Sequence, residues 1–391
     1  MGPSAIYARS LYQIVMNIGF DAKRAAQNAT GLGNYSRFII SLLARFTPEN
    51  ALKLYVPDSS RTQLLQRLPQ SQQISVVCPQ GPAALFKPLW RTYGITRRLK
   101  KDGIQLFHGL SNELPLNICK ANGVKTIVTI HDLLFLRFPA GYKPIDRWIY
   151  NFKFKRACRN ADRIIAVSHF TKQEIIDNYD ICPDKIDVVY QGCDPQFRQT
   201  VSNEQKTVIR ELHHLPPRYI LYIGSIERRK NLLLLAKAMR RVDPSVPAIA
   251  IGRRTEYTAE VEKFLDENHL KNRLRIIHSI PFEHLPAIYQ MATVFVYPSR
   301  CEGFGIPMLE ALCSGVPAVG CTGSCLEEAG GPDSAYVSPD NPDELADTLN
   351  GILNDREWRE RMIQRGRAYA EKFRDEQLIK SLLDVYERTL S

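Results

Sequence analysis

The strongest chemical signal in this sequence is a pair of glutamates, Glu302 and Glu310, on either side of a glycine-rich turn. Gly303 and Gly305 let backbone amides approach a ligand closely, and Pro307 indicates that a helix opens there. The N-terminus of a helix favours an anionic ligand. The two carboxylates can thus hold hydroxyl groups at separate points of one extended ligand. The alternative is that both are surface acids that flank a turn.

A run of basic residues follows a second glycine turn. The strand-like segment Tyr219–Ile223 ends at Gly224, and Arg229 and Lys230 precede a leucine-rich helix. Arg offers a bidentate fork and Lys a point charge, so together they could neutralise a diphosphate. Cations are unfavourable at a helix N-terminus, which suggests an anionic partner. Taken alone, this run could also be a solvated charged face.

Two weaker signals lie in the first half of the chain. Gly33 belongs to a Gly-x-Gly loop before an amphipathic helix, a pattern that also occurs without a ligand. His131 directly follows the strand-like run Lys125–Ile130, and residues beyond the carboxyl end of a parallel strand face the ligand. His131 could donate a hydrogen bond to a sugar hydroxyl or to a leaving phosphate. Because a lone histidine is usually structural, this interpretation depends on the other motifs.

Several familiar motifs are missing from the sequence. Without an Asp-x-Asp pair, there is no obvious carboxylate pair for a metal that bridges a diphosphate. The P-loop and the Gly-x-Gly-x-x-Gly dinucleotide fingerprint are also absent, which argues against a P-loop kinase and a nicotinamide dehydrogenase. The nine cysteines form no C-x-x-C pair, which favours reduced thiols. We therefore expect no metal and no cofactor.

The elements that position these residues form two α/β domains. Short apolar runs alternate with helical patterns along all 391 residues, as in parallel sheets covered on both faces. We expect two Rossmann-like, doubly wound domains, 16–200 and 201–391, that face each other across a cleft. The polar stretch from about Pro195 to Pro217 is expected to link them. Besides those already named, strands are expected at Asn17–Asp21, Lys53–Val56, Ile74–Val77, Gln105–His108, Arg163–Val167, Ile186–Tyr190, Ala248–Ile251, Leu274–Ile277, Thr293–Tyr297 and Pro317–Val319.

Charge and hydropathy bear on location. No apolar run approaches the roughly 20 residues that span a bilayer, and residues 1–15 lack the pattern of a signal peptide. We expect Met16 to be the natural start and the protein to be cytoplasmic. Residues 1–200 carry 27 Lys and Arg against 14 Asp and Glu, a net charge of +13 within a chain total of +11. This imbalance suggests either an anionic partner or a merely soluble basic face.

Two basic, aromatic-rich stretches, 85–101 and 142–156, concentrate this charge. Both have the composition of interfacial helices, which would place the protein peripherally on the inner face of the cell membrane. The alternative, favoured slightly for the second stretch, is a core-packed helix with a solvated basic side.

Together these motifs resemble glycosyltransferase family 4, retaining enzymes of the GT-B fold that use nucleotide-sugars. The resemblance covers nearly the whole chain from Met16. It rests on the Gly31–Gly33 loop, His131-Asp132, the run Val167–Lys172, Arg229–Asn231 and, above all, the Glu302–Glu310 string.

The resemblance implies that the C-terminal domain binds the nucleotide-sugar and the N-terminal domain the acceptor. Arg229 and Lys230 would hold the diphosphate, Glu302 the donor-sugar hydroxyls and Glu310 the ribose, while the backbone of Ile280 would meet the nucleobase. Amides near Phe304 would cap sugar and phosphate. The implied catalytic residues are His131 and Glu302; the implied donor-binding residues are Gly33, Gly224, Arg229, Lys230, Ile280, Gly303, Phe304, Gly305, Ile306 and Glu310.

Two positions depart from the family pattern. Ser225 stands where many relatives carry Arg, so the diphosphate would rest more heavily on Arg229 and Lys230. Asn34 stands where relatives often carry Arg on the acceptor side, so the acceptor contacts implied by the resemblance do not carry over to it. The expected reaction is metal-independent front-face transfer of mannose or another hexose, from GDP-mannose or a UDP-hexose, to a saccharide or lipid-linked saccharide. Double displacement through Glu302 is an open alternative. Other readings are a sugar phosphorylase or sucrose-synthase-like enzyme, and a basic nucleic-acid-binding protein, although we expect no nucleic acid partner.

Overall fold

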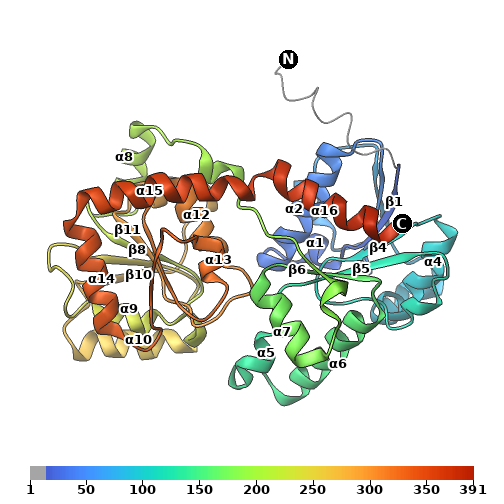
Figure 1. Ribbon diagram of the computed structural model, residues 1–391, viewed down its shortest axis with the longest axis horizontal. Helices are drawn as coiled ribbons and strands as arrows, with labels where there is room; N and C mark the ends of the chain where they lie inside the picture. The colour runs from blue at the N-terminus through green and yellow to red at the C-terminus, as the bar shows by residue number, and fades with distance from the viewer. Residues whose placement is uncertain (1–14) are drawn as a thin grey trace. The chain divides into compact units, whose positions relative to one another are not determined.

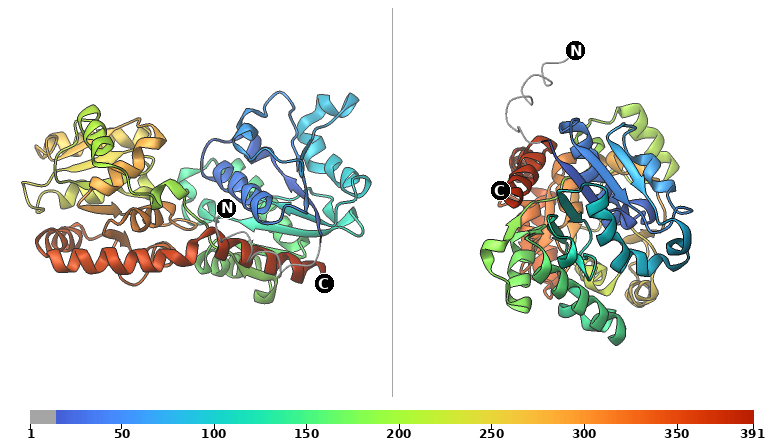
Figure 2. Two further views of the ribbon diagram at one scale, coloured as in Figure 1. Left: turned by 90° about the horizontal axis from the view of Figure 1, so that it is seen from above. Right: turned by 90° about the vertical axis from the view of Figure 1, so that its right-hand side faces the viewer.

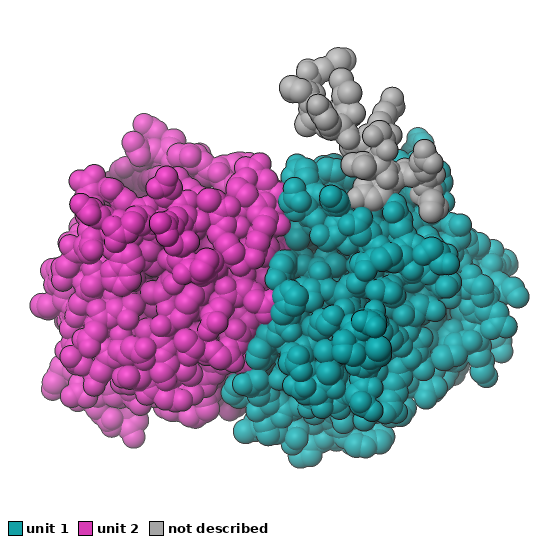
Figure 3. Space-filling view, in the orientation of Figure 1, with its two compact units in different colours: residues 1–190, 375–391 teal, residues 191–374 magenta. Residues whose placement is uncertain are grey.

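The computed structural model describes residues 15–391 and divides the chain into two compact units. Unit 1 contains the chain up to Tyr190 together with Asp375–Ser391, and unit 2 contains Gln191–Arg374 (Figure 3). Residues 1–14, on which the expectation of a start at Met16 depends, lie outside the described residues.

Unit 1 is built on seven parallel strands in the order β3-β2-β1-β4-β5-β6-β7 (Figure 1). The strand order reverses between β1 and β4. The strands are β1 (Asn17–Asp21), β2 (Ala51–Tyr55), β3 (Ile74–Val77), β4 (Leu106–Gly109), β5 (Lys125–Ile130), β6 (Arg163–Ala166) and β7 (Ile186–Val188). The α-helices are α1 (Lys23–Gln27), α2 (Gly31–Phe46), α3 (Lys87–Leu89), α4 (Ile95–Lys101), α5 (Leu134–Arg137), α6 (Pro144–Asn160), α7 (His169–Tyr179) and α16 (Asp375–Leu390).

Two apolar cores cover the two faces of this sheet. Leu106 and Ile165 pack with α2 and α16, whereas their chain neighbours Phe107 and Ile164 pack with α4 and α6. Because successive side chains of a strand point to opposite faces, both neighbours are buried. This explains the nearly continuous apolar runs of the sequence. Figure 2 shows the sheet of unit 1 between its helices.

The last helix, α16, belongs to unit 1, although the sequence prediction placed it in a domain of residues 201–391. Its buried face, which includes Leu378 and Leu382, joins the core that α2 covers (Figure 1). Tyr386 of this helix also makes a 2.7 Å hydrogen bond between its Oη and Nδ1 of His108 in β4. The predicted domain ranges therefore differ from the observed units at the C-terminus, and also at the boundary after Tyr190.

Unit 2 contains six parallel strands in the order β10-β9-β8-β11-β12-β13, and here the order reverses between β8 and β11. Ile223, Ile251 and Ile277 end three neighbouring strands in one paired row. The strands are β8 (Ile220–Ile223), β9 (Ala248–Ile251), β10 (Leu274–Ile277), β11 (Val294–Tyr297), β12 (Ala318–Cys321) and β13 (Ala335–Val337). The α-helices are α8 (Asn203–Leu212), α9 (Leu232–Ala238), α10 (Glu256–Glu267), α11 (Leu285–Met291), α12 (Ile306–Ser314), α13 (Leu326–Gly330), α14 (Pro342–Asn354) and α15 (Arg356–Ala370).

The stretch predicted to link the domains contains helix α8 (Asn203–Leu212) and lies within unit 2, so the prediction of a linker from about Pro195 to Pro217 is wrong. Ser202 caps this helix, because its hydroxyl accepts a hydrogen bond from the backbone N–H of Gln205 at 3.2 Å. Ile209 is its one buried residue. A helix that buries so little carries a polar sequence, which is why composition alone suggested a linker. Strand β13 was not predicted.

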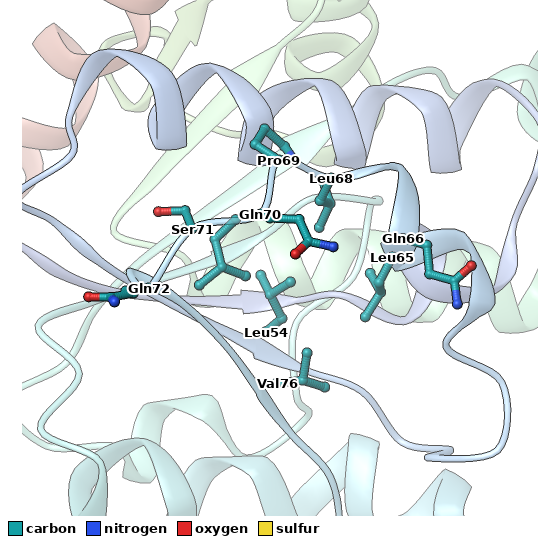
Figure 4. A pocket seen from close by; sticks show the side chains of 10 residues that line it. Leu54, Leu65, Gln66, Leu68, Pro69, Gln70, Ser71, Gln72 and Val76 are labelled. Atoms are coloured by element: carbon teal, nitrogen blue, oxygen red, sulfur yellow. The ribbon is translucent and has the colours of Figure 1, made fainter.

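An apolar pocket of about 500 Å³ lies in unit 1 beside β2 and β3. Leu54, Leu65, Leu68 and Val76 line it (Figure 4). The residues predicted for the functional site are not among its lining residues. Within residues 15–391, none of the helices combines the length and the apolar character needed to cross a membrane.

Candidate active site

The predicted donor-side residues that belong to unit 2 lie at one edge of its sheet, whereas Gly33 lies in unit 1. Gly224 follows β8, and Glu302 lies in the loop after β11. These two strands flank the point at which the strand order reverses, and ligands of doubly wound sheets bind beyond the carboxyl ends of the strands at this point. Ile280 follows β10 at the same edge and is half-buried; its contact with a nucleobase stays a prediction.

The carboxylate of Glu302 is fixed by three donors on one oxygen. Its Oε1 accepts from Arg229 Nη1 at 2.6 Å, from Tyr297 Oη at 2.8 Å and from Ser299 Oγ at 2.9 Å. Burial alone would raise the pKa of Glu302, but the charges of Lys230 and Arg229 and these hydrogen bonds hold the pKa below its ordinary value. Glu302 is therefore ionised at neutral pH.

Three consecutive cations after β8 lie in different surroundings. Arg228 is 74% exposed and pairs with Glu260 on α10. Arg229 is only 17% exposed and contacts Glu302. Lys230 places its Nζ 5.6 Å from the centre of the Tyr297 ring, and within residues 15–391 it has no ion-pair partner at contact distance. These three cations therefore do not form a uniform solvated face, because the side chains of Arg229 and Lys230 point inward.

Lys230 lies close to the glycine turn. A Cβ at Gly224 would be 3.2 Å from Cδ and 3.4 Å from Nζ of Lys230, so the lysine stem crosses this glycine. The same ammonium group is the largest electrostatic contribution that lowers the pKa of Glu302. The site therefore holds a half-buried positive charge beside a glycine turn, an arrangement suited to an anionic ligand.

Glu310 lies on α12 in a different environment. Its Oε2 accepts a hydrogen bond from Tyr289 Oη at 2.9 Å. Burial raises the pKa of Glu310 to about 7, and the nearby charge of Asp194 acts in the same direction. Within the part of the chain that the structure describes, Glu310 forms no salt bridge. A half-buried carboxyl group with one protein donor is suited to hydrogen bonds with ligand hydroxyls.

The glycine loop opens α12 as the sequence predicts. Helix α12 begins at Ile306, with Pro307 in its first turn. Gly305 has φ +107°, a conformation that other residues rarely adopt, and a Cβ there would lie 2.7 Å from Leu326 Cδ2. Phe304 is buried, and its ring centre is 5.5 Å from that of Phe373. Ligand contacts by the amides of residues 303–306 stay predictions.

His131 in unit 1 is a buried, neutral imidazole. Its Nε2 is 2.9 Å from the carbonyl oxygen of Leu110, and because a carbonyl only accepts, Nε2 carries the ring proton. Burial lowers the pKa of His131 to about 4. Its backbone N–H donates to Asn112 Oδ1 at 2.7 Å. The single ring N–H of His131 is thus engaged with Leu110, and donation from His131 to a sugar or phosphate stays a prediction.

The glycine loop of unit 1 has a packing role. A Cβ at Gly33 would lie 1.8 Å from the carbonyl oxygen of Asn28, so only glycine fits in the first turn of α2. Asn34 accepts a hydrogen bond on its Oδ1 from Arg37 Nη2 at 2.5 Å, and Arg37 is itself buried. The requirement for Gly33 is explained without a ligand, and its contact with the donor stays a prediction.

The structure also reveals a charged cluster that the sequence analysis missed. Arg91 contacts Asp21 at 2.6 Å and Glu113 at 2.7 Å, and Lys153 contacts Glu113 at 3.3 Å. Asp21 ends β1 and Glu113 follows β4, so this cluster lies where the strand order of unit 1 reverses. Arg91 belongs to the stretch 85–101, which was predicted to be an interfacial helix. This prediction is wrong for Arg91, because its side chain is only 13% exposed.

Tyr289, Tyr297 and Ser299 support the two glutamates but were not predicted as site residues. Tyr297 and Ser299 adjoin the motif, so their proximity in sequence was an available signal. Tyr289 comes from α11, and nothing in its local pattern points to Glu310. Within residues 15–391, no three His, Cys, Asp or Glu side chains gather where they could hold a metal ion.

Two family models match the chain in succession. The model described as Glycosyltransferase Family 4 matches residues 37–197, and the model described as Glycosyl transferases group 1 matches residues 204–369. The chain belongs to glycosyltransferase family 4. This glycosyltransferase is 28% identical, over 95% of its length and the whole of the relative, to the O-antigen chain mannosyltransferase B of Escherichia coli.

A second relative and a solved structure are also similar to this glycosyltransferase. The O-antigen chain mannosyltransferase RfbU of Salmonella typhimurium is 25% identical over 58% of this glycosyltransferase and 60% of RfbU. The crystal structure of Anabaena HepE in complex with UDP and glucose matches with a TM-score of 0.74 and 17% identity, over 95% of this chain and all of that one. The predicted GT-B fold, with two Rossmann-like domains, is confirmed.

Proposed function

We propose that this glycosyltransferase moves mannose from a nucleoside diphosphate sugar to a saccharide or lipid-linked saccharide, with retention of configuration and without a metal. The observation that carries the proposal is the arrangement of Arg229, Lys230 and Glu302 at the carboxyl ends of β8 and β11. Two inward-facing cations beside a fixed carboxylate suit a diphosphate joined to a polyhydroxyl group.

Lys230, Arg229 and Glu310 bind different parts of the donor. Lys230 meets the diphosphate as a point charge, and Arg229 adds a second positive charge. Glu302 holds the Arg229 guanidinium through Nη1, and Nη2 lies 3.6 Å from Glu227 Oε2. Ser225 does not replace the missing arginine, because its hydroxyl donates to Glu227 Oε1 at 2.7 Å. Glu310 accepts hydrogen bonds from the ribose.

The contacts of Glu302 favour front-face transfer over double displacement. The cations and donors that lower the pKa of Glu302 also make its carboxylate a weaker nucleophile. Because three donors engage Oε1, Oε2 is left to accept from the sugar hydroxyls. In the proposed step, the bond between the anomeric carbon and the diphosphate oxygen breaks, and Lys230 stabilises the charge that develops on that oxygen. The acceptor hydroxyl attacks the same face, and its proton passes to the leaving phosphate. The sugar hydroxyls are held by Glu302.

The choice of mannose rests on the relatives, two of which are named O-antigen mannosyltransferases. A screen of GDP-mannose, UDP-glucose, UDP-galactose and ADP-glucose by thermal shift tests it, since a bound donor raises apparent stability. GDP-mannose should give the largest shift and should support transfer to a mannose-terminated acceptor. Transfer only from a UDP-hexose would overturn the choice of mannose and leave the diphosphate site standing.

Metal independence rests on Arg229 and Lys230, which supply the positive charge that a metal gives elsewhere. Transfer should continue at an unchanged rate after extensive dialysis against EDTA. A strict requirement for added magnesium or manganese would contradict this part of the proposal.

A lipid-linked acceptor would bring the protein to a membrane, and unit 1 carries exposed apolar side chains suited to it. Phe86 is 60% exposed and Trp148 is 66% exposed. Other apolar side chains of the two predicted stretches are also exposed, namely Leu85, Leu89, Tyr93, Ile145 and Phe152. Trp90 and Phe154 of the same stretches are buried, so only part of each stretch is available. The exposure of Trp148 speaks against a core-packed role for that side of α6.

Co-sedimentation with anionic and neutral vesicles tests this association. The wild-type protein should pellet with anionic vesicles, and binding should weaken as salt rises. Replacing exposed Arg97, Lys100 and Lys101 by Gln should reduce it, at about 1 kcal/mol for each charge near the surface. Failure to pellet with either vesicle would exclude the membrane and favour a soluble acceptor.

A further inference from the structure

Two cysteines of unit 2 lie in direct contact. Sγ of Cys193 is 3.1 Å from Sγ of Cys313, and the residues are only 6% and 8% exposed. Both are free thiols. They are 120 positions apart in the sequence, so the fold of unit 2 brings them together. To reach the disulfide bond length of about 2.05 Å, the two sulfur atoms need to approach each other by about 1 Å.

Other buried thiols of this unit have different contacts. Cys325 donates to the carbonyl oxygen of Glu302 at 2.9 Å, and Cys301 is 3.9 Å from the same oxygen. Those contacts hold the motif loop in place. The contact between Cys193 and Cys313 instead joins sulfur to sulfur, which is the geometry from which a disulfide forms.

The two thiols have different acidities. The hydrogen bond from Cys193 lowers the pKa of Cys313, and the positive charge of Arg198 acts in the same direction against burial. The same hydrogen bond and burial raise the pKa of Cys193. Cys313 is therefore the sulfur that reacts first as a thiolate, and Cys193 holds the proton.

A pocket gives access to this pair. Cys313 lines a pocket of about 220 Å³ together with Arg198, Arg367 and Arg374. Glu371 is the one acidic residue among its lining residues, and it pairs with Arg198 at 3.2 Å. Three arginines against one glutamate leave the pocket positively charged, so it attracts small anionic molecules.

We propose that Cys193 and Cys313 form a redox-active thiol pair, oxidised reversibly by a small anionic disulfide such as oxidised glutathione. The Cys313 thiolate attacks one sulfur of that disulfide, and the other leaves as a thiolate. Cys193 then loses its proton, attacks Sγ of Cys313 and releases the second half of the small disulfide as a thiolate. The two protons lost by Cys313 and Cys193 pass to the two departing thiolates. Two protein thiols are oxidised, and one small disulfide is reduced to two thiols.

The new bond would join two functionally distinct parts of unit 2. Cys193 lies three residues after Tyr190, where the chain leaves unit 1. Cys313 lies on α12, less than one turn after Glu310. Oxidation would therefore fasten the entry segment of unit 2 to the helix that carries Glu310. Cross-linking residues so far apart should also raise the thermal midpoint, by about 2 °C or more.

Alkylation and peptide mass spectrometry test the proposal on the full-length protein. After incubation with oxidised glutathione, wild type should yield the cross-linked peptide pair of Cys193 and Cys313, and dithiothreitol should remove it. Cys193→Ser should instead retain glutathione on Cys313, because the resolving thiol is gone. Cys313→Ser should show neither product. The double variant Cys119→Ser, Cys182→Ser, which removes two exposed thiols, should still cross-link.

Unchanged alkylation of Cys193 and Cys313 in glutathione-treated wild type would overturn the proposal. So would glutathione on Cys119 and Cys182 alone. Because the wild-type protein itself gives the decisive reading, the test does not depend on the variants folding.

Discussion

In both units, cationic and acidic side chains lie where the strand order of the sheet reverses. The two units differ in whether each cation has an acidic partner. In unit 1, Arg91 forms ion pairs with Asp21 and Glu113, so the guanidinium and both carboxylates each contact a group of opposite charge. In unit 2, Arg229 contacts Glu302, but Lys230 has no ion-pair partner among residues 15–391. Both places lie at the carboxyl ends of the strands, where doubly wound sheets bind ligands.

This difference separates a structural role from a binding role. The bridge of Arg91 fixes β1, β4 and the segment before α4 to one another. Removal of the arginine would leave Asp21 without its ion-pair partner and Glu113 with Lys153 alone. In the proposed function, the inward-facing charge of Lys230 is instead met by the diphosphate of the donor. Charge clusters at equivalent places in related domains therefore have to be compared by their partners rather than by their composition.

The largest expected effect is on catalysis in unit 2. Glu302→Gln should lower kcat by about 10²–10³-fold or more, because the amide replaces a carboxylate that holds the donor sugar. Affinity for GDP and UDP should stay within about threefold, since the proposed function places Glu302 on the donor sugar and not on the nucleotide. Steady-state kinetics and calorimetry check both values. Glu283→Gln, at an exposed position, is the control; turnover at the wild-type rate in Glu302→Gln would remove Glu302 from the active site.

The next effect is on stability in unit 1. Arg91→Ala should lower the free energy of unfolding by about 3 kcal/mol, because Asp21 and Glu113 lose their shared cation. Urea denaturation measures this loss. Arg97→Ala on the neighbouring exposed surface should change it by less than about 0.5 kcal/mol. If the two variants were equally stable, the bridge would not be structural.

A smaller effect concerns pH. Burial raises the pKa of Glu310 to about 7, above the value of about 4.3 in an unfolded chain. Between these values the folded protein binds a proton that the unfolded chain has lost, so the free energy of unfolding falls as pH rises, and the loss is complete above about pH 7. Glu310→Gln should remove this component. Its stability relative to wild type should rise by about 2 kcal/mol between pH 5 and pH 8 in urea denaturation.

The exposed Glu283→Gln variant serves as the control for this comparison too, and its stability relative to wild type should not change with pH. A constant difference between Glu310→Gln and wild type across this range would show that Glu310 has an ordinary pKa.

Local features of the fold could be predicted from the sequence. Helix α14 (Pro342–Asn354) begins at two local signals of the sequence, because Asn341 caps it and Pro342 opens it. The end of β11 at Tyr297 and the start of α12 beside Pro307 also follow from neighbouring residues. The donor motif was visible in the sequence because its parts are close together along the chain.

Features that depend on distant partners could not be predicted. Arg91 meets residues 70 and 22 positions away, so its basic neighbours suggested a solvated or interfacial face instead. Helix α16 is amphipathic, but amphipathicity does not say which of two cores receives its apolar face. The partner of Glu310 is equally distant, since Tyr289 belongs to another helix.

In the proposed function Lys230 completes a diphosphate site, and calorimetry of GDP and UDP binding measures this contribution. Lys230→Ala should weaken binding about 10- to 100-fold, which corresponds to about 1.5–3 kcal/mol for a charge-assisted contact. Arg228→Ala is the matched control, because it removes an equal charge two positions away that points to solvent; its affinity should stay within about twofold of wild type. Equal affinities of Lys230→Ala, Arg228→Ala and wild type for GDP and UDP would show that Lys230 is not part of a diphosphate site.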